Sequence, residues 1–278
     1  MRAQILLLLA MCHPVVADAV PEHVRAQVES SMLVSGTLDI DREGRASGAM
    51  LDMAGQLPPG VIELVDAAAA KWRFEPVLVD GRVANVRTRM SLRVVATQAE
   101  GDTFTLSLRS ASFGLEEPEG SPRIHVRSRK PPVYPEMAVR QGIQGTVYAL
   151  ARVGRDGRVE DVVAEQVNLY VYGSERQMKS ARSLLADATL RAVRQWRFEV
   201  AADADPHPYR LVRAPVTYVF SVDLLKASHQ WESYVPGPRT SPPWAMDASR
   251  STGAPDALPE GGLSLLGNGP RLLTELAD

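Results

Sequence analysis

The stretch Trp196-Arg197-Phe198-Glu199 decides the fold, because the same four residues recur as Trp72-Arg73-Phe74-Glu75 in a similar setting. Each copy ends a segment whose apolar residues recur every three or four positions, which is typical of one face of a helix. A hairpin-like segment precedes each helix, and a strand-like segment follows it. The shared order of elements predicts two related units.

The first unit is expected over residues 20–114. Its hairpin turn centres on Gly44, because glycine readily takes the positive φ that a tight turn requires. Apolar spacing predicts a helix from Val61 to Trp72. Alternation of apolar with polar residues predicts a strand from Val83 to Val95, and Phe104, Leu106 and Leu108 suggest one more strand.

The second unit is expected over residues 131–226. A short helix, 136–141, ends at Gly142, and a strand-turn-strand segment runs from 145 to 167. Residues 168–179 are interpreted as an irregular insertion. A helix from 184 to 196 and a strand from 211 to 222 complete the unit.

The remaining segments flank these units. Residues 1–19 resemble a cleaved export signal, with one arginine before a short apolar run, and they indicate a periplasmic location. The run is shorter than the ~20 residues that a spanning helix needs. Lipidation at Cys12 is the alternative, disfavoured because the preceding Met11 is large. Residues 115–130 are interpreted as a linker, and residues 227–278 as a mostly disordered tail with a candidate short helix from Arg271 to Leu276.

Charge is distributed unevenly along the chain. Residues 20–114 contain 10 Lys/Arg against 12 Asp/Glu, whereas residues 121–226 contain 17 against 11, a net of 17 − 11 = +6. This positive half suits either an acidic partner or an ordinary solvated surface. The overall formal charge of -2 does not favour nucleic acid as a partner.

The residues typical of catalytic and metal sites do not form recognisable patterns. The five histidines are scattered, Cys12 is the single cysteine, and no phosphate-binding loop or nucleophile elbow occurs. We therefore expect no enzymatic activity, no cofactor and no metal site. Trp72 and Trp196 are interpreted as anchors between helix and sheet. The aromatic run Tyr170-Val171-Tyr172 stays open as a partner contact.

The second unit resembles the C-terminal domain of the TonB family of energy transducers. The resemblance rests on an ordered set of residues: Pro132, Tyr134, Pro135, Gly142, Gly145, Gly157, Trp196 and Phe198. The first unit resembles a degenerate copy that keeps Gly44, Trp72 and Phe74 but lacks the Tyr-Pro opening. The resemblance implies an α+β fold of two TonB C-terminal-like units, each a small antiparallel sheet with helices packed on one face.

The resemblance also implies a function. In that family, the exposed edge of the last strand receives an extended peptide of an outer-membrane transporter, which is β-augmentation. The matching edge here is residues 209–219, and the partner-binding residues expected are Tyr209, Leu211, Val212, Arg213, Val216 and Tyr218. The expected function is thus non-enzymatic binding of extended peptides of envelope transport proteins.

Two alternatives stay open at this point. One is a structural envelope protein that associates with acidic cell-wall or lipid components. The other is a full energy transducer whose N-terminal anchor is not cleaved, although the apolar segment is short and the Pro-rich stretch lies at the other end of the chain. The sequence does not indicate an oligomeric state.

Overall fold

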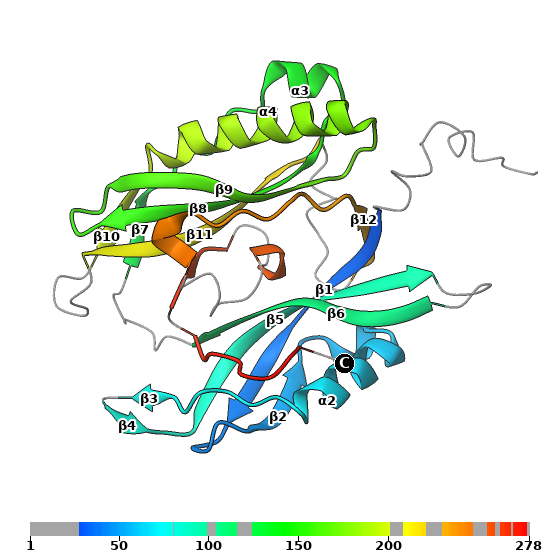
Figure 1. Ribbon diagram of the computed structural model, residues 1–278, viewed down its shortest axis with the longest axis vertical. Helices are drawn as coiled ribbons and strands as arrows, with labels where there is room; N and C mark the ends of the chain where they lie inside the picture. The colour runs from blue at the N-terminus through cyan, green and yellow to red at the C-terminus, as the bar shows by residue number, and fades with distance from the viewer. Residues whose placement is uncertain are drawn as a thin grey trace, which may run out of the picture.

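Two antiparallel sheets form the centre of the molecule, and each carries its helices on the face turned away from the other sheet (Figure 1). The computed structural model describes residues 28–79, 81–98, 104–115, 124–200, 208–220, 230–246, 255–258, 262–267 and 269–276. The expected signal segment, residues 1–19, lies outside this range. In the described part of the chain, no helix is long and apolar enough to cross a membrane.

The first sheet has the strand order β12-β1-β5-β6, and β2 also pairs with β1. Its bounds are Glu29–Ile40 for β1, Ala46–Leu51 for β2, Val86–Gln98 for β5, Phe104–Leu115 for β6 and Glu232–Tyr234 for β12. The helix α2, Pro59–Ala69, packs its apolar side on this sheet, and Trp72 fills the core at its end. A small hairpin of β3, Leu78–Val79, and β4, Arg82–Val83, precedes β5.

The second sheet has the order β13-β11-β8-β9. Its bounds are Gly145–Gly154 for β8, Val159–Leu169 for β9, Tyr209–Tyr218 for β11 and Ser264–Leu265 for β13. The helices α3, Glu136–Arg140, and α4, Glu175–Val193, cover its outer face (Figure 1). Beside it, β7, Ile124–Ser128, pairs with β10, Arg197–Val200. The α+β class and the small antiparallel sheets are as expected from the sequence.

The expected insertion at residues 168–179 is largely regular structure. The strand β9 continues to Leu169, and α4 already begins at Glu175. Ser174 caps this helix by a capping box, in which its side chain accepts a hydrogen bond from the Gln177 N–H and Gln177 bonds back to the Ser174 N–H. The Ser-x-x-Gln pattern marks this earlier start. The first turns of α4 are polar, so apolar spacing does not detect them.

In both sheets, the glycine of the hairpin turn forms a backbone hydrogen bond with the phenylalanine two residues after the tryptophan. Gly44 has φ 79° and Gly157 has φ 75°. The N–H of Phe74 donates to the carbonyl oxygen of Gly44 at 2.7 Å, and the N–H of Phe198 donates to that of Gly157 at 2.9 Å. The matching contacts explain why both glycines precede a Trp-Arg-Phe stretch. Descent of the two units from one ancestral unit stays a prediction.

The C-terminal segment follows both sheets instead of forming a disordered tail over its described residues. β12 pairs with β1, Val235 pairs with Leu169 at the outer edge of β9, and β13 pairs with β11. Short 3-10 turns at Pro243–Ala245 and Pro255–Ala257 lie between these contacts. Proline and glycine limit regular structure in this segment, but they do not prevent an extended chain from adding to strands that already exist.

Two smaller expectations are also corrected by the structure. Part of the predicted linker, residues 124–128, is the strand β7, because it can pair with β10. Residues 271–273 are extended and not helical: the N–H of Glu75 donates to Arg271 O at 2.9 Å, and the N–H of Leu273 donates to Arg73 O at 2.7 Å. Backbone hydrogen bonds to the first unit thus keep residues 271–273 extended.

Each tryptophan of the repeated stretch donates its indole N–H to a neighbouring extended segment. The Nε1 of Trp196 lies 2.9 Å from the carbonyl oxygen of Lys130, just after β7. The Nε1 of Trp72 lies 2.9 Å from the carbonyl oxygen of Leu276, near the chain end. The C-terminal residues therefore supply the acceptor for the tryptophan of the first unit, and residues before β8 supply the equivalent acceptor in the second unit.

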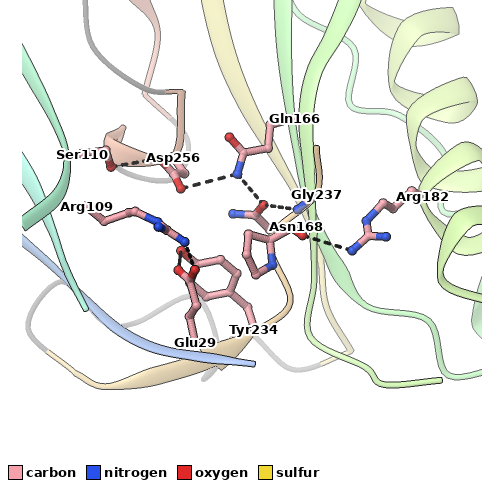
Figure 2. A network of polar contacts seen from close by, with 10 residues as sticks. Glu29, Arg109, Ser110, Gln166, Asn168, Arg182, Tyr234, Gly237 and Asp256 are labelled. Carbon is pink, nitrogen blue, oxygen red and sulfur yellow. Dashed lines mark hydrogen bonds and ion pairs between the residues drawn. The ribbon is translucent and has the colours of Figure 1, made fainter. Parts of the chain in front are cut away.

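A buried polar layer joins the two sheets through the C-terminal segment (Figure 2). The hydroxyl of Ser110 on β6 donates to one carboxylate oxygen of Asp256 at 2.9 Å, and Gln166 Nε2 on β9 lies 3.5 Å from the other. The guanidinium of Arg93 donates to the Asp256 carbonyl at 2.8 Å. These groups are buried and bonded, as buried polar groups must be.

Candidate functional site

The strand β11 contains every residue expected to bind a partner, and it crosses the second sheet beside β8 along its whole length. Its side chains alternate between the two faces of the sheet, as in any strand. Those of Val212, Val216 and Tyr218 belong to the core under α4. The Tyr218 hydroxyl lies 2.8 Å from Thr189 Oγ1 of α4, and burial raises the pKa of Tyr218.

The opposite face of β11 holds a buried ion pair. Arg213 Nε donates to Glu165 Oε2 of β9 at 2.6 Å, and Arg213 NH2 donates to Oε1 at 2.8 Å. Leu211 belongs to a small apolar cluster on the same face, and Tyr209 is half-buried beside it. The expected partner-binding side chains are therefore part of the packed interior on the two faces of β11.

Part of that edge is already paired. β13 lies antiparallel to β11, with Val212 opposite Leu265 and Arg213 opposite Ser264. The N–H of Leu266 donates to the carbonyl oxygen of Leu211 at 2.9 Å. The edge of β11 accepts an extended chain in this geometry, and the occupant is a segment of the same molecule.

Further along β11, residues 215–219 line a pocket of about 490 Å³. The other walls come from the segment before α3 and from the end of α4: Arg129, Pro131, Pro132, Tyr134 and Trp196. The Arg129 guanidinium lies 4.9 Å from the centre of the Trp196 ring. The pocket thus joins a strand edge to an apolar and aromatic surface.

Tyr134, which lines this pocket, packs against a further aromatic side chain, that of Phe220. The rings of Tyr134 and Phe220 are stacked 5.4 Å apart, and Phe220 is 51% exposed. The Tyr134 hydroxyl donates to the Ile143 carbonyl at 2.6 Å. Burial raises the pKa of Tyr134 to about 12, so the hydroxyl stays a neutral donor at physiological pH.

The residues that carry the family resemblance have structural positions. Pro135 precedes α3, Gly142 follows it with φ 66°, and Gly157 and Phe198 hold the hairpin turn described above. Gly145 lies against β9, where an added Cβ would be 2.3 Å from the Asn168 carbonyl oxygen. The glycines of the set are explained by close backbone approach and turn geometry.

The aromatic run after β9 divides between two roles. The Tyr170 hydroxyl lies 2.8 Å from Thr146 Oγ1 inside the sheet. Val171 and Tyr172 instead line a pocket of about 560 Å³ against the first turn of α4, and Tyr172 is 41% exposed. Of the run, Val171 and Tyr172 remain candidates for a partner contact.

Sequence reasoning missed two parts of this site. The local sequence around Glu165 predicts an ordinary strand, and the pairing of Glu165 with Arg213 depends on two strands that are neighbours of β8 on opposite sides. The second is the segment around Ser264 and Leu265. Its short apolar run, Leu263-Ser264-Leu265-Leu266, was the available signal inside a Pro- and Gly-rich stretch.

Within the described residues, no cluster of three or more His, Cys, Asp or Glu side chains has metal-binding geometry. His125 is exposed on β7, and the other four histidines lie outside the described residues.

Comparison with known proteins gives one family and one structure. Residues 130–166 match the family described as Gram-negative bacterial TonB protein C-terminal, which confirms the resemblance of the second unit. A solution NMR structure of the Pseudomonas aeruginosa TonB C-terminal domain is 24% identical, with coverage of 37% of this chain and 91% of that chain and a TM-score of 0.25. No curated protein matches.

Proposed function

Because residues 130–166 carry the sequence of the TonB C-terminal family, we propose that this protein is a non-enzymatic, TonB-like protein of the periplasm. It binds extended peptides of outer-membrane transport proteins by adding them to the edge of β11. The observation that carries the proposal is the pairing of β13 with β11, since this edge accepts an extended chain in antiparallel register.

The pocket beside residues 215–219 supports the same assignment. The Leu211 carbonyl points toward β13, and strand alternation directs the backbone of residues 215, 217 and 219 toward the same side. A peptide that continues along this edge would lay alternate side chains over Tyr134 and Trp196. Backbone pairing then supplies affinity, and the aromatic pocket supplies selectivity.

A titration of the full chain with N-terminal peptides of outer-membrane transporters tests the proposal. We expect binding to change the tryptophan fluorescence of the chain, through Trp196, and the amide signals of residues 215–219. No binding at millimolar peptide would reject it. Val219→Pro, which removes a backbone donor from the edge, should weaken binding more than Val219→Ala, which shortens the side chain and keeps the donor.

A second candidate is association with acidic envelope components. It is favoured by exposed basic side chains near the end of α4 and on the β7–β10 ribbon: Arg127, Lys130, Arg191, Arg194 and Arg197. Salt separates the candidates, because surface electrostatic attraction weakens as ionic strength rises. Binding of anionic vesicles that persists in high salt would contradict this second candidate.

A further inference from the structure

Three neighbouring strands of the first sheet correspond in order to three of the second sheet, and the two sheets differ in the strand that comes next. In the first sheet β2, β1 and β5 are neighbours in that order, and in the second sheet β9, β8 and β11 are. The next position is taken by β6 in the first sheet and by β13 in the second. The molecule thus contains two versions of one edge with different occupants.

The occupants differ in how firmly they are held. β6 follows β5 directly in the chain and pairs with it from Thr88 to Gln98. β13 comes from far along the chain and pairs, within the described residues, at Val212 and Arg213. A strand that pairs over so short a length contributes little stability by itself. The edge of β5 is thus paired along most of its length with β6, whereas the edge of β11 is paired with β13 over a short segment.

The covering segment shows which side chains this edge accepts. Leu265 packs against the core beneath α4, and Leu266 packs against the cluster of Leu150, Leu211 and Ala245 on the opposite face. Adjacent residues of a strand point to opposite faces, and both faces here are apolar. An occupant of this edge therefore needs two consecutive aliphatic residues in an extended conformation.

We propose that β13 is an intramolecular stand-in for the partner, and that the partner is an extended segment with two adjacent aliphatic residues that displaces it. The proposal rests on the proposed function and adds the chemistry of the peptide and a competitor. The C-terminal segment is held on both sides of β13, by Thr240 against Glu165 and by Leu273 against Arg73. Displacement is thus confined to the part between these anchors.

A covalent lock tests the displacement. Val212 and Leu265 are opposite each other and are flanked by the Leu266–Leu211 hydrogen bond, so they form a non-hydrogen-bonded pair with Cα atoms about 4.5 Å apart. This spacing permits a disulfide. The variant carries Val212→Cys and Leu265→Cys in the full chain, with Cys12→Ser to remove the single natural cysteine.

Two labelled peptides serve as probes: one with the sequence of residues 260–270 of this chain, and one N-terminal peptide of an outer-membrane transporter. We expect both to bind the reduced variant at least about tenfold more tightly than the oxidised one, because the locked β13 keeps the edge at Val212 and Arg213 occupied and leaves the peptide only residues 215–219 to pair with. Restoration of binding by a reductant is part of the expected result.

The failures of the two proposals differ. Equal binding of the transporter peptide by the oxidised and reduced forms would overturn the displacement and leave the proposed function standing. No binding of either peptide by the reduced and the unaltered chain at millimolar concentration would overturn both.

A variant without new cysteines gives an independent measurement. Leu266→Ala removes the side-chain packing of the residue that directly follows β13, and we expect it to raise the affinity for the residue 260–270 peptide about tenfold. The matched control is Leu273→Ala in the same segment, where the side chain is 58% exposed and lies outside β13. Unchanged affinity in Leu266→Ala, or an equal rise in the control, would contradict the proposal.

Discussion

Arg213 and Glu165 join β11 to β9 across the intervening strand β8 by a two-pronged ion pair whose side chains are both 0% exposed. Among the described residues, the Arg213 NH1 atom has no hydrogen-bond partner, and Arg239 NH2 lies 3.9 Å from Glu165 Oε1. A buried pair of this kind fixes the register of β11 relative to β9, because a shift of either strand would leave a buried charge without its partner.

Breaking this ion pair from one side should destabilise the protein strongly. We expect Arg213→Met to lower the free energy of unfolding by about 3–5 kcal/mol, because it leaves a buried carboxylate without its partner. The double change Arg213→Met with Glu165→Leu should recover most of the loss. Urea unfolding measures both, and a double variant less stable than the single one would contradict the explanation.

The hairpin glycines should differ from other glycines with positive φ. Gly81→Ala should cost about 1 kcal/mol, because its φ of 75° is unfavourable for alanine while the surrounding space is open. Gly157→Ala has the same φ, but its Cβ would be 1.8 Å from the Phe198 carbonyl oxygen. We expect a loss several-fold larger in thermal or urea unfolding. Equal losses would show that the close approach is not limiting.

Removing the chain end should loosen the first unit selectively. A chain that stops at Pro270 lacks the acceptor of the Trp72 indole and the apolar contacts of Leu272 and Leu276. We expect it to lose about 2 kcal/mol or more of stability. Amide hydrogen exchange should rise in β1, β2 and β6 more than in β8 and β9. A uniform rise would contradict the assignment of this segment to the first unit.

Alkaline pH should destabilise the protein through Tyr234. Burial raises the pKa of Tyr234 to about 12, whereas an unfolded tyrosine has a pKa of about 10. The folded state thus keeps the proton longer, so stability is full below pH 10 and falls between pH 10 and 12.

The share due to Tyr234 is about 2–3 kcal/mol at the upper limit of this window. Tyr234→Phe has no hydroxyl to ionise and should lose less stability over the same interval. Unfolding by urea at pH 8, 10 and 12 compares the two proteins. Parallel profiles would show that Tyr234 does not carry the effect.

Local sequence patterns predicted the elements that depend on neighbouring residues. The apolar spacing before Trp72 and Trp196, the turns at Gly44 and Gly157 and the alternation in β5 and β11 all have counterparts in the structure. Periodicity works here because each element turns one apolar side to a core. Apolar spacing predicts the start of α4 at residue 184, later than the observed Glu175, because the first turns of the helix are polar and its start is marked by the Ser174 cap.

Pairing between segments far apart in the chain could not be predicted from local sequence patterns. The path of the C-terminal segment is set by acceptors and donors of strands formed elsewhere, such as the Leu169 backbone that bonds Val235. A segment rich in proline and glycine has weak preferences of its own. Its structure therefore depends on sheet edges that exist only after folding.

By itself, the sequence determined that the chain builds α+β units with a Trp-anchored helix and that the second unit has TonB C-terminal family features, because these depend on local periodicity and on glycines at tight turns. Tertiary structure alone decided that the C-terminal segment joins both sheets, that Arg213 is buried against Glu165 and that β13 covers part of the β11 edge. The physical reason is that backbone pairing requires few particular side chains, so a strand edge and its occupant are recognisable only when both are in place.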